Sequence, residues 1–301
     1  MKRDADLKVK VNDKYKNEKI IEILYKEFGM SGRFVRKLKK SKTIEINGEN
    51  KSVYNRVELG DVIDIFFPIE ACEDIPNEDI KIKVIYEDKW LMAVEKPAGL
   101  LVHPIKEEQT DTLSNGISAY MKEKGEDYIV RHVNRLDRDT SGVILIAKNS
   151  YIHDQIAVQM SKGEVKKNYQ AIVLGILDEK SKCLEYPIGK PDIKNIRREV
   201  MDQGKPSTTV YEVVAESENA SLLNIRLITG RTHQIRVHMA YIGHPVLGDD
   251  LYGVFDESIG RQALHAGSYI FKHPITNEIV SIKSDLPEDM QKIIKQKNLN
   301  N

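Results

Sequence analysis

The stretch NRLDRDTSGVILIAK, residues 134–148, places two arginines and two aspartates directly before an apolar run. Residues 143–147 are apolar and follow turn-forming residues, a pattern typical of a buried strand. Asp137 would then lie on the loop that leads into this strand, where its carboxylate can face a cleft. The residues after it form turns readily and can hold the loop rigid: Asp139, Thr140 and Ser141. An ordinary surface turn with local ion pairs is the alternative interpretation.

Further strand-like runs occur on both sides of this stretch, among them WLMAVEK, YQAIVLG, TTVYEVV and SLLNIRLI. Between them, amphipathic helices are predicted over 111–125 and 150–163, and the tail at 286–301 is predicted to be a short helix with a frayed end. Strands outnumber helices and their spacing is irregular. The pattern therefore favours an α+β fold with a mixed, mainly antiparallel sheet over a regular βαβ series. The chain has no internal repeat and no glycine loop typical of nucleotide binding.

The first seventy residues read as a separate small unit. NEKIIEILYKEFG, residues 17–29, follows the helical period, with Asn17 as the expected cap and Gly29 as the expected stop. Ser31 can cap a second helix. A hairpin with an Asn47-Gly48 turn and one more strand follow. The sequence thus predicts a compact binding module at 1–70, an acidic linker at 71–80 and a main domain at 81–301.

The second helix of this module is strongly basic. Residues 31–42 contain six Lys or Arg and no acid, and the cations on the exposed side of the helix are Arg33, Arg36, Lys37, Lys39 and Lys40. The formal net charge of the chain is +0, which alone argues weakly against nucleic-acid binding. The distribution of charge matters more than its total, so a phosphate-binding face is one interpretation of this helix, and a solvated surface is the alternative.

Composition excludes several other classes of protein. No apolar run approaches the roughly 20 residues of a membrane span, and the N-terminal segment lacks the apolar core of a signal peptide. Only Cys72 and Cys183 are present, too few for a disulfide framework or a zinc cluster. We therefore expect a protein of the reducing cytoplasm that does not associate with membranes.

A second charged cluster, TGRTHQIRVHMAYIGHPVLGD, spans residues 229–249. A helix that begins near Thr232 would bury Ile235, Met239 and Ile242. Four side chains would then gather near the start of this helix, where backbone N–H groups also favour anions: Arg231, His233, Arg236 and His238. The histidines could also suggest zinc, but no cysteine or suitably spaced acid completes a ligand set.

Together these segments resemble the RluA/RluD-type family of RNA pseudouridine synthases, which isomerise uridine in ribosomal or transfer RNA. The resemblance extends over about residues 81–285 and is carried, in the order of the family, by KPAGLLVHP (96–104), NRLDRDTSGVILIAK (134–148), KKNYQAIVLG (166–175), GKPSTTVYEVV (204–214), TGRTHQIRVHMAYIGHPVLGD (229–249) and RQALHA (261–266). The first seventy residues are similar to an S4-like RNA-binding domain. One position departs from the family pattern: Asn134 stands where many members have His.

The resemblance implies a role for individual residues. Asp137 would be the catalytic carboxylate, Arg236 its ion-pair partner and Tyr169 the aromatic residue that stacks on the target base. A guanidinium beside a carboxylate favours the ionised form. Arg135 would fill the space that the flipped nucleotide leaves. The remaining side chains expected to contact RNA are Arg138, Arg231 and His233 in the main domain, and Arg33, Arg36, Lys37, Lys39 and Lys40 in the N-terminal unit.

The implied activity is isomerisation of uridine to pseudouridine in RNA, by a monomer that needs no cofactor and no metal. Large-subunit ribosomal RNA is the first expectation for the substrate, and tRNA remains open. Two hypotheses from other classes are an inactive RNA-binding protein and a nucleosidase that hydrolyses the base from its sugar. Intact Asp137, Tyr169 and Arg236 argue against the first. The second would need an activated water and a second positioned acid or a metal, and Asp139 is too near in sequence to be a convincing partner.

Overall fold

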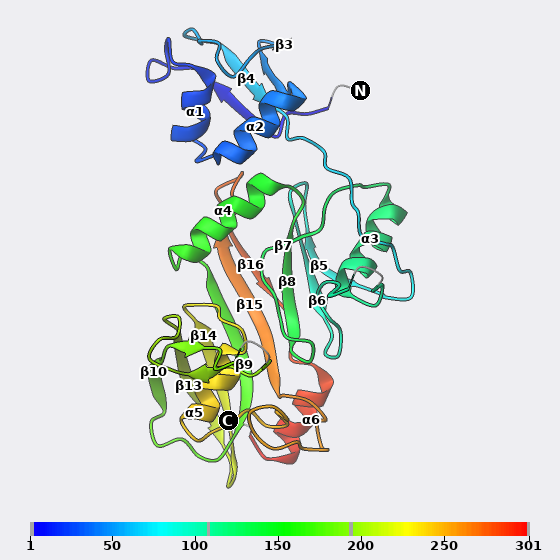
Figure 1. Ribbon diagram of the computed structural model, residues 1–301, viewed down its shortest axis with the longest axis vertical. Coiled ribbons are helices and arrows are strands. Elements are labelled where there is room, and N and C mark those ends of the chain that lie inside the picture. Colours follow the sequence, from blue (N-terminus) through cyan, green and yellow to red (C-terminus); the bar gives the residue numbers. More distant parts are fainter. Residues whose placement is uncertain (1–2, 107–108, 193–194, 300–301) are drawn as a thin grey trace.

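The protein is described by a computed structural model that covers residues 3–106, 109–192 and 195–299. A ten-stranded sheet forms the body of the molecule, and a small unit with a four-stranded sheet lies at one end of it (Figure 1). Within the described residues, no helix is long and apolar enough to cross a membrane. The prediction of an α+β fold is confirmed.

The N-terminal unit consists of two helices and an antiparallel sheet in the order β1-β4-β2-β3. Its elements are β1 (Leu7–Lys10), α1 (Ile20–Lys26), α2 (Gly32–Ser41), β2 (Ile44–Ile46), β3 (Glu49–Asn50) and β4 (Val62–Ile65). The hairpin at Asn47-Gly48 is confirmed, and Ser31 caps α2 by accepting the Phe34 N–H at 3.3 Å. The strand β1 was not expected, because its four residues lie in a lysine-rich segment with only two apolar positions.

The predicted N-cap of the first helix is wrong, whereas Gly29, the expected stop, has a left-handed backbone with φ of 55° two residues after the C-cap Glu27. Helix α1 begins at Ile20 and has Lys19 as its N-cap, while Asn17 has a left-handed backbone with φ of 63°. Asn17 therefore belongs to the turn before the helix. The backbone N–H of Ile20 bonds to the Asn55 carbonyl, and that of Ile21 to the Val53 carbonyl. These bonds from a distant loop satisfy the first turn, so no side-chain cap is needed.

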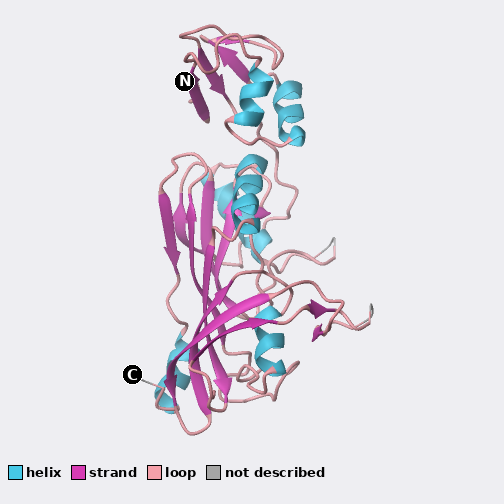
Figure 2. Cartoon of the chain, turned by 90° about the vertical axis from the view of Figure 1, so that its left-hand side faces the viewer, coloured by secondary structure: helices cyan, strands magenta, loops and turns pink. Residues whose placement is uncertain are grey.

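The large sheet has the strand order β10-β13-β14-β9-β15-β8-β6-β5, with β16 beside β15 and β7 beside β8. Its strands are β5 (Lys83–Glu87), β6 (Leu91–Lys96), β7 (Arg131–His132), β8 (Ser141–Ala147), β9 (Lys166–Leu174), β10 (Ser181–Glu185), β13 (Thr208–Glu216), β14 (Ala220–Leu227), β15 (Leu264–Lys272) and β16 (Ile279–Lys283). Every pairing is antiparallel except that of β8 with β15. Figure 2 shows these strands as one continuous, twisted sheet. The expected mixed, mainly antiparallel sheet is confirmed.

The remaining elements are α3 (Leu113–Lys124), α4 (Ser150–Ser161), α5 (Gln234–Tyr241), α6 (Glu288–Gln296) and the short hairpin of β11 (Ile188–Gly189) and β12 (Glu199–Val200). The helices predicted in the main domain are thus all present. A capping box of Thr112 and Asn115 starts α3, and Asn149 caps α4 by accepting the Ile152 N–H at 3.0 Å.

Strand β8 explains how the charged stretch is placed. All seven of its residues are buried, and it lies between β6 and β15 in the centre of the sheet. Gly142 has φ of 120°, and a Cβ there would collide with the backbone of Ala266 on β15. Glycine therefore permits the close parallel approach of β15 to the start of β8. The end of the loop before β8 is therefore fixed next to β15.

The N-terminal unit contacts the main domain through α4. Phe34, Phe67 and Tyr151 pack with ring centroids 5.1 to 5.5 Å apart, and all three side chains are buried. The Ser31 hydroxyl also donates to Asp154 at 2.9 Å. The segment expected to be a linker lies along α3, where Asn115 donates to the Ile75 carbonyl at 2.8 Å. These contacts give the basic helix α2 a defined position relative to the large sheet.

Candidate active site

A cavity of about 650 Å³ lies beside the charged loop, between the two halves of the large sheet. The loop before β8, strand β9 and the start of α5 supply most of its polar lining, which includes Asn134, Arg135, Asp137, Arg138, Lys167, Tyr169, Arg231, His233, Arg236 and Tyr269. The structure therefore brings together the side chains that the sequence placed on three separate segments. A carboxylate, several cations and an aromatic ring share this one cavity.

The loop that carries Asp137 is anchored at consecutive residues. The Thr140 N–H bonds to the Asp137 carbonyl at 3.1 Å and closes the predicted turn. Lys96 Nζ donates to the Arg138 carbonyl at 2.7 Å, and Arg261 Nη1 donates to the Asp139 carbonyl at 3.1 Å. The end of β6 and the segment before β15 thus hold the backbone on the C-terminal side of Asp137. These bonds limit the positions available to its carboxylate.

Lys96 is an unusual anchor because it is fully buried. Its ammonium also donates to the carbonyls of Pro97 and Leu100, both at 2.8 Å. Burial lowers the pKa of Lys96 to about 7. The three carbonyl oxygens match the three N–H donors of the charged form, so the side chain ties the end of β6 to the Asp137 loop.

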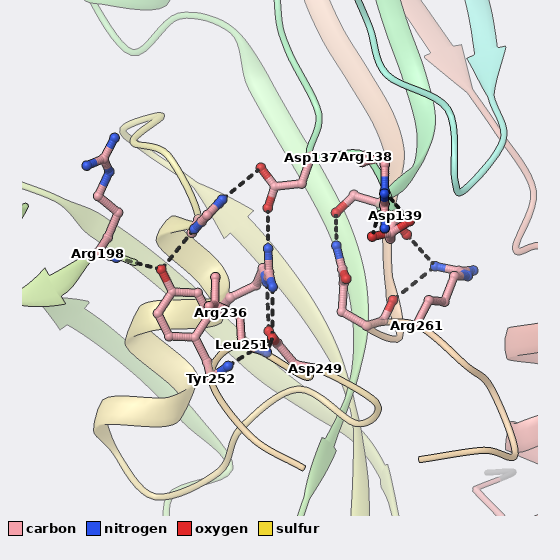
Figure 3. Close-up of polar contacts among 12 residues, drawn as sticks. Asp137, Arg138, Asp139, Arg198, Arg236, Asp249, Leu251, Tyr252 and Arg261 are labelled. Carbon is pink, nitrogen blue, oxygen red and sulfur yellow. Dashed lines mark hydrogen bonds and ion pairs between the residues drawn. The ribbon is translucent and has the colours of Figure 1, made fainter. Parts of the chain in front are cut away.

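Arg236 connects Asp137 to a second, fully buried carboxylate (Figure 3). Its Nη1 donates to Asp137 Oδ2 at 3.0 Å, while Nε and Nη2 form a fork on Asp249 at 2.7 and 2.8 Å. Burial disfavours the Arg236 charge, but the bonds to Asp249 outweigh it and raise the pKa of the guanidinium. The expected pairing of Arg236 with Asp137 is present, and Asp249 fixes the orientation of the fork.

His233 faces the other oxygen of the same carboxylate. Its Nε2 lies 3.8 Å from Asp137 Oδ1, and its Nδ1 lies 2.8 Å from the Tyr252 hydroxyl. The backbone N–H of Arg198 donates to that hydroxyl at 2.7 Å (Figure 3). The Tyr252 hydrogen can then be donated to His233 Nδ1. Burial lowers the pKa of His233, although the charge of Asp137 opposes this shift. A neutral imidazole with its hydrogen on Nε2 fits both contacts.

Tyr169 lies on β9 at the back of the cavity and is buried. Its hydroxyl lies 3.0 Å from that of Tyr269 on β15, which also contacts Asn134 Nδ2 at 3.0 Å. Burial raises the pKa of Tyr169, and the negative charge of Asp137 adds to this shift. The tyrosine expected to stack on a base thus lines the cavity, and Tyr269 connects it to Asn134.

The other predicted contacts to RNA differ in their surroundings. Arg135 is exposed, lines the cavity and forms no ion pair with any described residue. Arg138 is also exposed and pairs with Asp139 at 3.2 Å. Arg231 donates to the Pro206 carbonyl at 3.2 Å. His238 does not join the cluster expected at the start of α5, because it is fully buried and contacts the Tyr186 carbonyl at 2.9 Å.

The basic helix α2 divides into two groups. Four of its cations are exposed: Arg33, Arg36, Lys39 and Lys40. Lys37 is half-buried and forms an ion pair with Glu70, which also pairs with Arg131. Lys37 therefore takes part in the contact between the two units.

The site contains residues that the sequence did not single out: Lys96, Asp249, Arg261 and Tyr269. The first three lie inside segments quoted above for their family resemblance. Their place in these motifs was the signal in the sequence that could have identified them as site residues. Tyr269 follows the RQALHA segment by three residues, in a run that reads as an ordinary strand. Their partners in the site are 13 to 135 residues away in the chain, a distance at which periodicity and spacing carry no information.

Known proteins resemble this chain in sequence and in fold. Residues 90–241 match the family of RNA pseudouridylate synthases. The chain is also 36% identical over 274 residues to the RNA pseudouridine synthase YjbO of Bacillus subtilis (strain 168), covering 90% of this chain and 97% of the relative. The chain belongs to the RNA pseudouridylate synthase family. It is therefore an isomerase that acts on RNA, and the RluA-type resemblance is confirmed.

Two further comparisons concern substrate and fold. The chain is 34% identical over 226 residues to the ribosomal large subunit pseudouridine synthase D of Pseudomonas aeruginosa, covering 70% of each protein. The solved structure of human RNA pseudouridylate synthase domain containing 4 aligns with a TM-score of 0.60 and 22% identity, covering 73% of this chain and 94% of that one. This second likeness supports the fold of the large sheet.

Proposed function

We propose that this pseudouridine synthase modifies uridines of large-subunit ribosomal RNA. The observation that carries the proposal is the similarity to a relative named for that RNA, which extends over most of both chains. Transfer RNA is the alternative substrate class. We also propose that the enzyme acts as a cytoplasmic monomer.

Asp137 is the catalytic carboxylate in this proposal. Pseudouridine forms when the bond from ribose to the uracil nitrogen breaks, the base turns, and the ring rejoins the sugar through carbon 5. A carboxylate near the anomeric carbon stabilises or captures the sugar when the base leaves, as in glycosyl transfer. The fork of Arg236 on Asp249 supports this assignment, because it directs one remaining N–H of the guanidinium to Asp137.

Other side chains position the nucleotide. Tyr169 supplies the aromatic face for the target base at the back of the cavity. Arg135 fills the space that the flipped nucleotide leaves, which its exposure at the cavity rim allows. Turning a nucleotide out of its stack costs a few kcal/mol, and the cost is lowest in loops. A single-stranded or bulged uridine is therefore the expected target. Arg138, Arg231 and His233 contribute charge and shape near the same opening.

The substrate proposal is tested by mapping pseudouridine in ribosomal and transfer RNA from cells with and without the gene. Loss of modification at one or more positions of the large-subunit RNA, with restoration by the wild-type gene, is expected. An Asp137→Asn gene that fails to restore the same positions links the loss to catalysis. Loss of pseudouridine from tRNA alone would show that the substrate is tRNA and not large-subunit ribosomal RNA.

We also propose that residues 1–70 are an S4-like RNA-binding domain, separated from the catalytic domain at 81–301 by the segment 71–80. The exposed cations on α2 support this proposal, and Lys37 differs from them because Glu70 already neutralises it. Removing the whole unit would uncover Tyr151 of α4. Substitution of surface cations is therefore a cleaner test than truncation.

Changing Arg33, Arg36, Lys39 and Lys40 together to Gln should weaken RNA binding and flatten its salt dependence. Each lost phosphate contact reduces the slope of log K against log salt by roughly 0.7 to 0.9. Binding is measured at several salt concentrations.

The matched control changes four other lysines of the unit, each of which pairs with an acid: Lys8, Lys14, Lys26 and Lys51. It alters the net charge equally, so a long-range charge effect would appear in both variants. Equal affinities and slopes for the two variants would contradict a binding function for α2.

Activity should survive exhaustive chelation. Within the residues that the structure describes, no three His, Cys, Asp or Glu side chains gather where they could hold a metal ion. The reaction is measured on refolded substrate RNA after treatment with a chelator, with RNA folding checked separately. Loss of turnover that zinc restores while the RNA stays folded would refute the metal-free mechanism.

A further inference from the structure

Lys167 on β9 is a cation in the wall of the cavity, and only 8% of the residue is exposed. Its ammonium donates to the Ile228 carbonyl at 3.4 Å, which is long for a hydrogen bond. Among the described residues, Lys167 has no ion-pair partner and no second hydrogen-bond acceptor. An ammonium carries three N–H donors, so the protein leaves most of the donor capacity of Lys167 unused.

Two other buried lysine side chains of the main domain have full sets of partners. Lys96 donates to three backbone carbonyls at 2.7 to 2.8 Å. The side chain of Lys148 is 8% exposed and forms ion pairs with Glu87 and Glu126. Burying a charge without such partners is unfavourable. The contacts within the fold therefore do not account for Lys167, whereas a ligand that accepts from its ammonium would.

The sheet directs Lys167 into the cavity. Lys167 and Tyr169 are two positions apart on β9, so their side chains lie on the same face of the strand. Tyr269 is paired directly opposite Lys167 on β15. All three side chains line the cavity. The Lys167 ammonium lies at the exposed loop after β14, where a Cβ placed on Gly230 would be 3.9 Å from Nζ.

Arg231 brings a second cation to the same part of the cavity. It follows Gly230, is exposed, and forms no ion pair with any residue that the structure describes. Burial lowers the pKa of Lys167, and the positive charge of Arg231 adds to this shift. The carboxylate of the catalytic loop, Asp137, pairs with Arg236 instead. Two cations that act on each other without an acid between them favour the binding of an anion.

We propose that Lys167 and Arg231 together bind one phosphate of the RNA next to the target uridine. The proposal rests on the proposed placement of the target base beside Tyr169. A phosphate offers charged oxygens that can accept from both cations at once. Lys167 and Tyr169 are about 7 Å apart along β9, a separation on the scale of one nucleotide. The phosphate contact would fix the position of the backbone while the base occupies the inner part of the cavity.

Lys167→Met tests the binding role, because Met removes the charge and keeps an unbranched side chain. The enzyme concentration that gives half the maximal single-turnover rate should rise about ten-fold, since hydrogen bonds between charged groups are strong. The maximal rate should change less than about two-fold, as expected when ground-state and transition-state binding weaken equally. A lower maximal rate at an unchanged half-saturating concentration would assign Lys167 to the chemical step and overturn the phosphate site.

The matched control is Lys166→Met, which removes the same charge from the next position of β9. Lys166 is exposed and its side chain lies on the opposite face of the strand. Its half-saturating concentration should stay close to wild type, and an equal rise in both variants would reduce the effect to long-range charge. Thermal unfolding of Lys167→Met should occur at or above the wild-type temperature, because an uncompensated buried charge is removed. A lower unfolding temperature with unchanged RNA binding would mean that Lys167 only supports the fold.

The decisive test replaces phosphates of the substrate one at a time by a neutral methylphosphonate, at the linkages that flank the target uridine. At one linkage the replacement should weaken binding to the wild type about ten-fold. The same replacement should leave the binding of Lys167→Met unchanged, because that contact is already lost. Arg231→Gln should show the same coupling at the same linkage. Absence of coupling at every linkage, or coupling of the two variants to different linkages, would overturn the inference.

The outcome is separable from the proposed function. The substrate is a synthetic fragment of whichever RNA the wild type modifies, so a mistaken RNA class leaves the experiment intact. If the target base does not enter this cavity, Asp137→Asn will still release tritium from carbon 5 of the labelled uridine. An inactive Asp137→Asn together with no phosphate coupling of Lys167 would refute the phosphate site alone.

Discussion

Asp137→Asn is expected to reduce pseudouridine formation by on the order of 10³-fold or more, since loss of a nucleophile or charge stabiliser has effects of this size. Asn keeps the shape of Asp and much of its hydrogen bonding, and the turn from Asp137 to Thr140 is closed by backbone groups. The loop should therefore persist while the charge and the reactive oxygen are lost. The measurement is release of tritium from carbon 5 of labelled uridine in the RNA.

Asp139→Asn is the matched control for this experiment. The Asp139 side chain pairs with the exposed Arg138 and is itself 30% exposed, so its loss should change the rate only slightly. RNA affinity and thermal stability should be close to wild type in both variants. Substantial tritium release by the Asp137 variant, or a complete loss only in the Asp139 variant, would show that the wrong carboxylate was assigned.

Arg236→Met should impair both folding and catalysis. Asp249 is fully buried, and without the guanidinium the contacts that its charge keeps among the described residues are the N–H bonds from Leu251 and Tyr252. Breaking a buried pair by removing one partner costs about 3 to 5 kcal/mol of unfolding free energy. Asp137 loses its direct ion-pair partner at the same time. Denaturant unfolding and the tritium assay measure the two effects separately.

The double variant Arg236→Met/Asp249→Asn distinguishes these two roles. Asn can still accept from the Leu251 and Tyr252 N–H groups, but it carries no buried charge. Stability should therefore recover in large part, while activity stays low because nothing replaces the bond to Asp137. Recovery of activity together with stability would mean that Arg236 supports only the fold.

Some features of the protein follow from local sequence, because local interactions produce them. Strand β8 is apolar on both faces and preceded by turn formers, so its burial and the loop position of Asp137 were both predictable. The same holds for the caps of α2 and α4, where one side chain meets an N–H a few residues away. The pairing of Arg236 with Asp137 came from family resemblance, since the two residues are 99 positions apart.

Other features depended on contacts between distant segments. The start of α1 was misplaced because backbone groups of a remote loop, and no local cap, satisfy its first turn. Nothing in the periodicity of β8 and β15 showed that they would be parallel neighbours. The anchors Lys96 and Arg261 reach the Asp137 loop only after β6, β8 and β15 have come together.

The sequence by itself determined the α+β class, the charged loop before a buried strand, and the family to which the chain belongs. Only the tertiary structure decided that Asp249 orients Arg236, and that Tyr269 contacts both Asn134 and Tyr169. Apolar periodicity and turn chemistry act over a few residues and are visible in the order of side chains. A hydrogen bond between side chains depends on where two strands end in space, and strand order is set by burial of the whole sheet.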